Sequence, residues 1–106
     1  MTSWTSVGKV ADFAMGSAKA IEVNGETICL VRNKTGFHAV SDVCTHGAVS
    51  LSEGTVTDVG IECWLHGSEF DLETGKPKTP PATTALEVFE IQIEGDGENG
   101  IVKVGI

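Results

Sequence analysis

Two short segments constrain the fold of this chain more than any other feature, because each carries a Cys followed closely by a His. The first reads Cys44-Thr45-His46-Gly47 and the second reads Cys63-Trp64-Leu65-His66-Gly67. The Gly that ends each segment allows the backbone to turn tightly beneath a ligand, where a side chain would clash. The four Cys and His side chains can serve one site only if the fold brings the two segments side by side.

Two cysteines and two histidines are compatible with either zinc or an iron–sulfur cluster. A tetrahedral zinc site accepts this ligand set, but common zinc modules pair Cys with Cys and His with His. Here each segment contributes one of each, with the Cys first both times. This arrangement favours a [2Fe-2S] cluster in which both thiolates bind one iron and both imidazoles bind the other.

The rest of the chain has the pattern of antiparallel strands, because short runs rich in Val, Ile and Thr are broken by Gly, Asn and Asp. Asn24-Gly25, between Ala20–Val23 and Glu26–Arg32, is the strongest hairpin signal. The same pattern predicts further turns and strands over residues 33–40, 55–63, 86–93 and 101–104.

The alternation of apolar residues slips between Val88 and Phe89, which predicts a bulge or a change of buried face. We find no repeat, linker or second domain. The prediction is a single all-β domain over residues 1–106, folded as a small antiparallel β-sandwich or barrel.

The charge of the chain excludes several classes of partner. Its 7 basic and 15 acidic residues give a net charge of −8, which opposes binding to nucleic acid or to an anionic membrane surface. The charge favours partners with basic patches. No segment approaches the ~20 apolar residues of a spanning helix, and the first residues do not read as a secretion signal. We therefore expect a cytoplasmic protein without a membrane partner.

The paired segments and their surroundings resemble the Rieske [2Fe-2S] family. Residues Ala39–Val43 are similar to the strand that leads into the first ligand segment, and Phe70–Gly75 are similar to the exit strand and turn after the second. Thr79–Ala82 resemble the proline-bearing loop that lies against the cluster. The resemblance extends over nearly the whole chain, from about Trp4 onward.

This resemblance implies a Rieske-like fold with two cluster-binding loops at one tip of the molecule. We call them the first loop (residues 44–50) and the second loop (residues 63–70). The implied cofactor is one Rieske-type [2Fe-2S] cluster, and its implied ligands are Cys44, His46, Cys63 and His66.

The resemblance also places residues around the cluster. High-potential members have a cysteine in each loop that joins in a disulfide, at the positions of Val49 and Leu65 here, and a Tyr at the position of Phe70. Ser68 matches a Ser that donates to a bridging sulfide, although its hydroxyl is equally compatible with a backbone partner. Taken together, these residues predict a reduction potential of the cluster toward the low end of the Rieske range of about −150 to +300 mV.

Three apolar residues are implied to form a rim around the histidine ligands, whose far ring nitrogens face solvent: Trp64, Pro80 and Pro81. An apolar centre of this kind suits the small interface of a short-lived electron-transfer complex.

The implied function is that of a ferredoxin component of a bacterial aromatic-ring-hydroxylating dioxygenase system, with a similarity to carbazole-type systems. Such a protein is not itself an enzyme. It takes electrons singly from a flavin-dependent NAD(P)H reductase and passes them to a terminal Rieske non-haem iron oxygenase, and we expect it to be a monomer. Two alternatives are a small subunit of another oxidoreductase, similar to that of nitrite reductase, and a zinc-stabilised interaction module.

Several other residues have simpler interpretations. Cys29, within an apolar strand, is expected to be a buried thiol rather than a ligand. Trp4 and Phe13 are expected to anchor the core, and His38 to be exposed or locally hydrogen-bonded. Three acidic residues near the loops are candidates for contacts with basic partner residues, or only keep the protein soluble: Asp42, Glu53 and Glu62.

Overall fold

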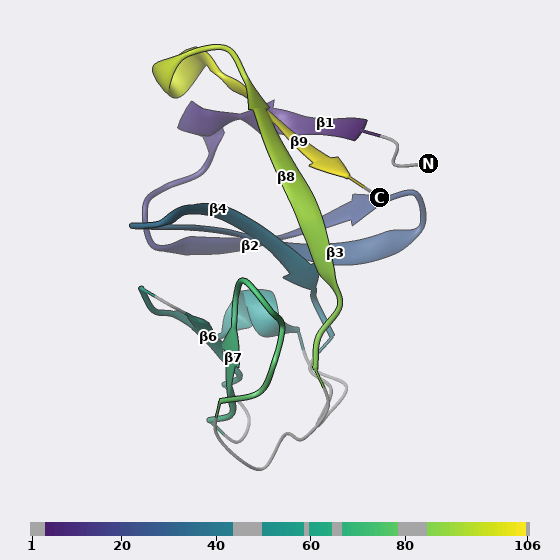
Figure 1. Ribbon diagram of the computed structural model, residues 1–106, viewed down its shortest axis with the longest axis vertical. Helices are drawn as coiled ribbons and strands as arrows, with labels where there is room; N and C mark the ends of the chain where they lie inside the picture. The colour runs from purple at the N-terminus through teal and green to yellow at the C-terminus, as the bar shows by residue number, and fades with distance from the viewer. Residues whose placement is uncertain (1–3, 44–49, 59, 65–66, 79–84, 106) are drawn as a thin grey trace.

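The computed structural model describes residues 4–43, 50–58, 60–64, 67–78 and 85–105, and their strands form two antiparallel sheets (Figure 1). The larger sheet has the order β1-β9-β8-β4-β3-β2. Its strands are β1 (Trp4–Lys9), β2 (Ser17–Val23), β3 (Glu26–Asn33), β4 (Gly36–Ser41), β8 (Val88–Glu94) and β9 (Ile101–Gly105). The small sheet contains β5 (Thr55–Val56), β6 (Gly60–Glu62) and β7 (Glu69–Asp71). The predicted all-β, antiparallel fold is confirmed.

Three short 3-10 turns complete the described secondary structure: η1 (Val10–Asp12), η2 (Leu51–Glu53) and η3 (Gly97–Asn99). The small sheet lies at one end of the long axis, and β1 with the β8–β9 turn lies at the other (Figure 1). Within the described residues, no helix has the length and apolar character needed to cross a membrane.

The hairpin predicted at Asn24-Gly25 joins β2 to β3. Both turn residues have left-handed backbone angles, with φ of 50° at Asn24 and 84° at Gly25. Positive φ at both positions is the signature of the tight turn whose twist matches that of the flanking strands. The strand before the turn begins at Ser17, three residues earlier than the apolar pattern predicted, because Ser17 pairs with Arg32 across the sheet.

Strand β3 separates two hydrophobic cores because successive side chains point to opposite faces. Ile28 and Leu30 belong to the core enclosed by the curved six-stranded sheet, whereas Cys29 and Val31 belong to the core that faces the small sheet. All four are buried. We call the second set the inter-sheet core; its buried members are Cys29, Val31, Val40, Leu51, Ile61, Cys63, Phe70, Leu72 and Leu86.

The predicted change of buried face near Val88 is also confirmed. Leu86 packs into the inter-sheet core, Val88 is exposed, and Phe89 packs into the core of the larger sheet. The chain therefore passes from one core to the other at this point, where β8 pairs briefly with β4 before continuing alongside β9.

Of the two aromatic residues expected to anchor the core, only Phe13 does so. Phe13 is buried and meets Phe37 edge-to-face, with ring centroids 5.7 Å apart. The prediction for Trp4 was wrong, since its side chain is 41% exposed. Trp4 begins β1, an edge strand that pairs on one side with β9.

Candidate metal centre

The second loop is held closed at its base by two backbone hydrogen bonds. The N–H of Cys63 donates to the carbonyl of Ser68 at 2.8 Å, and the N–H of Gly67 donates to the carbonyl of Cys63 at 3.0 Å. Gly67 has a φ of 74°, which confirms that this position requires the backbone freedom of glycine. Cys63 itself is 2% exposed, and His66 lies outside the described residues.

The first loop is closed at its base in a similar way. Val43 and Ser50 form an antiparallel bridge, and the N–H of Leu51 donates to the carbonyl of Asp42 at 2.7 Å. The chain therefore leaves the larger sheet and returns to nearly the same place. The predicted ligands Cys44 and His46 lie between these anchor points, outside the described residues.

Both loops emerge from the same core. Leu51, directly after the first loop, and Cys63, the first residue of the second, are both members of the inter-sheet core. The backbone approaches closely here, because a Cβ on Gly54 would lie 2.0 Å from the carbonyl oxygen of Glu62. A buried thiol beside the base of the other loop fits a metal centre shared by the two loops.

Asp42 corrects one of the predictions. Rather than facing a partner, its side chain is 2% exposed, and its carboxylate accepts a hydrogen bond from the N–H of Ser52 at 2.9 Å. Asp42 lies two residues after Val40, so the alternation of the strand turns both toward the same buried side. This period-two relation to an apolar residue is the signal in the sequence that pointed to burial. Glu53 and Glu62 are exposed, as a contact or solubilising role requires.

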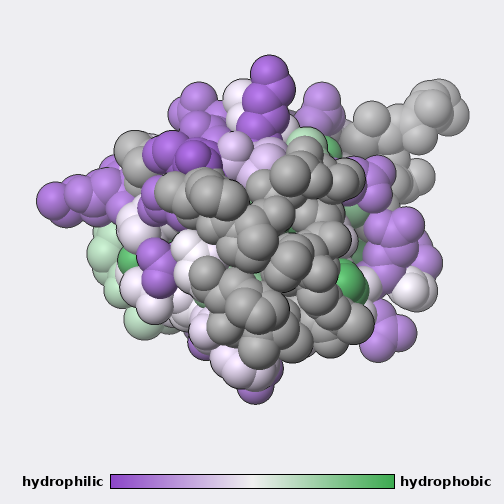
Figure 2. Space-filling model, turned by 90° about the horizontal axis from the view of Figure 1, so that it is seen from below, coloured by the Kyte–Doolittle hydropathy of each residue, from purple (hydrophilic) through white to green (hydrophobic). Residues whose placement is uncertain are grey.

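The predicted cluster environment is partly described. Ser68 and Phe70 are fully buried, whereas Trp64 is 52% exposed, so Trp64 presents an apolar surface directly after Cys63, a predicted ligand. Seen from the small-sheet end, hydrophilic side chains occupy much of the described periphery, with apolar ones among them (Figure 2). Four other positions named above lie outside the described residues: Val49, Leu65, Pro80 and Pro81.

The prediction that Cys29 is buried is confirmed. Burial, and after it the charge of Asp42, raise the pKa of the Cys29 thiol to about 12. Since metal ligation uses the thiolate, this environment opposes a ligand role for Cys29.

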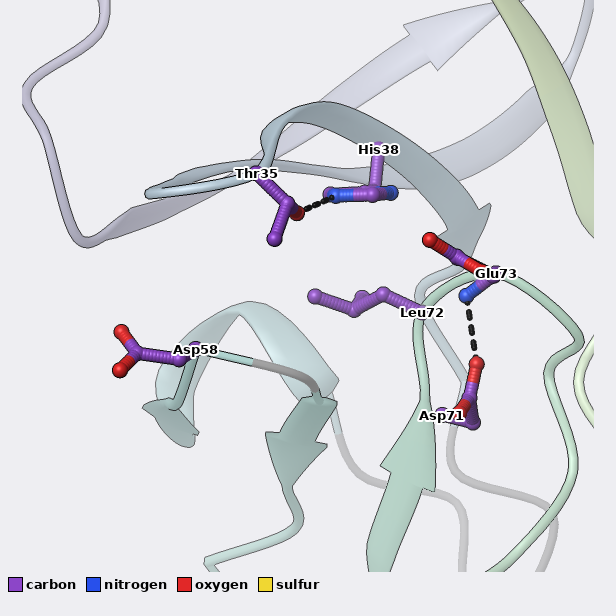
Figure 3. A pocket seen from close by; sticks show the side chains of 6 residues that line it. All are labelled: Thr35, His38, Asp58, Asp71, Leu72 and Glu73. Carbon is purple, nitrogen blue, oxygen red and sulfur yellow. Dashed lines mark hydrogen bonds between the residues drawn. The ribbon is translucent and has the colours of Figure 1, made fainter.

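A separate cavity of about 140 Å³ lies between the β3–β4 turn and the small-sheet region (Figure 3). His38 and Thr35 line one side, Asp58 and Asp71 lie opposite, and the Leu72 side chain points between them (Figure 3). The N–H groups of Thr74 and Glu73 donate to the Asp71 carboxylate and lower its pKa. Cys63, the predicted ligand that the structure describes, does not line this cavity.

His38 is locally hydrogen-bonded, as predicted. Its Nε2 lies 2.7 Å from Oγ1 of Thr35, and that hydroxyl donates its hydrogen to Oδ1 of Asn33. His38 must therefore be the donor to Thr35, which places a hydrogen on its Nε2. Burial lowers the pKa of His38, while the charges of Glu73 and Asp71 act in the opposite direction.

Comparison with known proteins gives the family of the chain. A family model described as the Rieske [2Fe-2S] domain matches residues 3–90. Ferredoxin CarAc of Metapseudomonas resinovorans is 38% identical over 96 residues, covering 90% of this chain and 89% of the relative. The ferredoxin component of biphenyl 2,3-dioxygenase from Rhodococcus jostii (strain RHA1) is 36% identical over 92 residues, covering 87% of this chain and 86% of the relative.

A solved structure agrees with these relatives. A chain from the complex of reduced oxygenase and oxidized ferredoxin in carbazole 1,9a-dioxygenase is 34% identical. It superimposes with a TM-score of 0.82 over 93% of this chain and 99% of that chain. The family match includes both loops, and its metal centre is an iron–sulfur cluster rather than zinc. The chain belongs to the Rieske [2Fe-2S] domain family, and its cofactor is one Rieske-type [2Fe-2S] cluster.

Proposed function

We propose that this chain is a single-domain, monomeric, cytoplasmic one-electron carrier of an aromatic-ring dioxygenase system. It accepts one electron from a flavin-dependent NAD(P)H reductase and gives one electron to the Rieske centre of a terminal oxygenase. The observation that carries the proposal is the common origin of the two loops in the inter-sheet core, with Cys63 buried there, in a chain 38% identical to a ferredoxin.

We assign four side chains as the ligands of the cluster: Cys44, His46, Cys63 and His66. Bound to iron, the cysteines are thiolates and the histidines are neutral imidazoles. The [2Fe-2S] cluster supplies one-electron chemistry, and the chain supplies its orientation and its surroundings. Burial of Cys63 beside the core, against exposure of Trp64 next to it, supports an arrangement with the thiolate side inward and the imidazole side toward partners.

The proposed partner surface is centred on Trp64 and includes Pro80 and Pro81. Exposed aromatic residues are enriched at protein interfaces, and an acidic periphery steers partners with basic patches. The net charge of −8 and the exposed carboxylates of Glu53 and Glu62, which flank the two loops, support this view.

The two alternatives receive less support. Because the chain belongs to the Rieske [2Fe-2S] family, an iron–sulfur protein is favoured over a zinc-stabilised interaction module. The relatives reported above are ferredoxins, one of them the ferredoxin component of biphenyl 2,3-dioxygenase, which favours a carrier over a nitrite-reductase-like small subunit.

The proposal is tested by rapid mixing of the reduced protein with the oxidised terminal oxygenase of an aromatic-ring dioxygenase system. We expect one electron per chain to pass to the oxygenase, followed by re-reduction of the chain by a flavin-dependent reductase and NAD(P)H. Absence of transfer in both directions, with the cluster intact by its visible spectrum, would contradict the proposed function.

A further inference from the structure

Asp42 is a buried carboxylate without a basic partner. Its side chain is 2% exposed, and in the part of the chain that the structure describes no Lys or Arg forms an ion pair with it. Taking an unpaired carboxylate out of water is costly, and a neutral side chain of similar size would avoid that cost. Its presence beside the cluster-binding loops therefore points to a role.

The first part of that role is geometric. Three hydrogen bonds join Asp42 to its surroundings: its N–H donates to the carbonyl of Thr27 at 3.1 Å, its carbonyl accepts from Leu51 at 2.7 Å, and its carboxylate accepts from Ser52 at 2.9 Å. Asp42 precedes the first loop, whereas Leu51 and Ser52 follow it. One residue thus holds both ends of the loop, with main chain and side chain acting together.

The second part is electrostatic. Asp42 is buried beside the inter-sheet core, because Val40, two residues earlier in the chain, and Leu51, whose N–H donates to the Asp42 carbonyl, both belong to that core. Cys63 belongs to the same core. Charges interact several times more strongly in such a low-dielectric interior than across the exposed surface. With two neutral imidazoles and two thiolates, reduction adds one negative charge to a site that is neutral when oxidised.

We propose that Asp42 is a positioning residue that lowers the midpoint potential of the cluster. Its side chain fixes the returning end of the first loop, and its buried negative charge disfavours the added electron. This inference rests on the proposed ligand set and function.

The test is a potentiometric titration of the purified, cluster-loaded protein, followed by its visible spectrum. Asp42→Asn removes the charge but keeps an oxygen that can accept the Ser52 hydrogen bond, and Asp42→Glu keeps the charge. Glu53→Gln is the matched control, because it removes the same charge from an exposed position near the same loop. Asp42→Ser provides a second neutral variant.

We expect Asp42→Asn to raise the equilibrium constant for reduction of the cluster about tenfold. For a one-electron couple this corresponds to a midpoint potential about 59 mV higher. Glu53→Gln should change it less than twofold, since solvent and salt screen an exposed charge, and Asp42→Glu should remain near the wild type. The spectrum should keep its Rieske form in all variants.

The inference is overturned if Asp42→Asn shifts the midpoint potential no more than Glu53→Gln does. If Asp42→Asn does not fold, Asp42→Ser takes its place in this comparison. Loss of the cluster in both neutral variants, with retention in Asp42→Glu, also overturns the claim about the potential. A wild-type protein without a Rieske spectrum would instead contradict the proposed function itself, so the two failures are distinct.

Discussion

The side-chain amide of Asn33 donates to the backbone carbonyls of Thr57 and Asp58, at 3.2 Å each, and so joins the end of β3 to the hairpin of the small sheet. Asn33 is 4% exposed. Its Oδ1 accepts from both the N–H and the hydroxyl of Thr35, so this buried amide uses both of its polar ends. The small sheet that carries the second loop is thereby fixed to the larger sheet by a polar link as well as by the inter-sheet core.

Replacing Asn33 should weaken this link. We predict that Asn33→Ala lowers the free energy of unfolding by about 1–3 kcal/mol, because two carbonyls and the Thr35 hydroxyl lose a buried partner. Urea unfolding followed by circular dichroism measures the change. Asn99→Ala, at an exposed position in η3, is the control and should stay close to the wild type. Equal stability of the two variants would show that the link contributes nothing.

The two described cysteines should respond differently to removal of the thiol. Cys63→Ala should abolish the visible absorbance of the cluster, because it removes an assigned ligand. Cys29→Ala should keep the absorbance and lose only about 1–2 kcal/mol of stability, the cost of a small core cavity. Both residues are buried in the same core, so they form a matched pair. A cluster that survives in Cys63→Ala would remove that residue from the ligand set.

The ring of His38 should stay neutral at a pH where a free histidine is already protonated. Its pKa lies below the ordinary value of 6.5, chiefly because burial disfavours the charged ring. As the pH falls, the histidine of the unfolded chain therefore binds a proton before His38 of the folded chain does. The contribution of the neutral His38 ring to the free energy of unfolding is complete above pH 6.5 and declines as the pH falls below it.

Titration of the His38 ring by NMR measures this directly. Glu73→Gln should lower its pKa further, because Glu73 is the leading charge that favours protonation. A His38 pKa at or above 6.5, or an upward shift in Glu73→Gln, would refute this description of the cavity.

Exposure of Trp64 should matter to partners rather than to the fold. We predict that Trp64→Ala slows electron transfer to the terminal oxygenase about tenfold, equivalent to about 1.4 kcal/mol of lost contact energy, with an unchanged visible spectrum. Trp4→Ala is the control, since Trp4 is similarly exposed and begins β1, a strand that lies at the opposite end of the molecule from the small sheet (Figure 1). Equal rates in the two variants would place the partner surface elsewhere.

Local signals in the sequence predicted the hairpins well. Asn24-Gly25 specifies its turn through backbone angles that these residues adopt easily, and the slip at Val88 reported the passage between two cores. Strand β1 gave no comparable signal, because its pairing with β9 joins the two ends of the chain. The exposure of Trp4 follows from that edge position and not from its hydrophobicity.

In the candidate site, too, local sequence signals predicted some features, whereas others depend on the packing of the sheet. The Cys and His spacing predicted the chemistry of the cluster, and Gly67 predicted the tight turn that the structure contains. The burial of Asp42 was missed because an acidic residue two positions before a predicted ligand suggests a surface position. Only its register with Val40 turns it inward, and register depends on the packing of the whole sheet.

The central claim is that two thiolates hold one iron and two imidazoles hold the other. Pulsed EPR of the dithionite-reduced protein, combined with iron and sulfide analysis, tests it most directly. We predict two irons and two inorganic sulfides per chain, with couplings from two directly bound imidazole nitrogens. A colourless protein with one zinc per chain, or a reduced cluster without nitrogen couplings, would contradict this account.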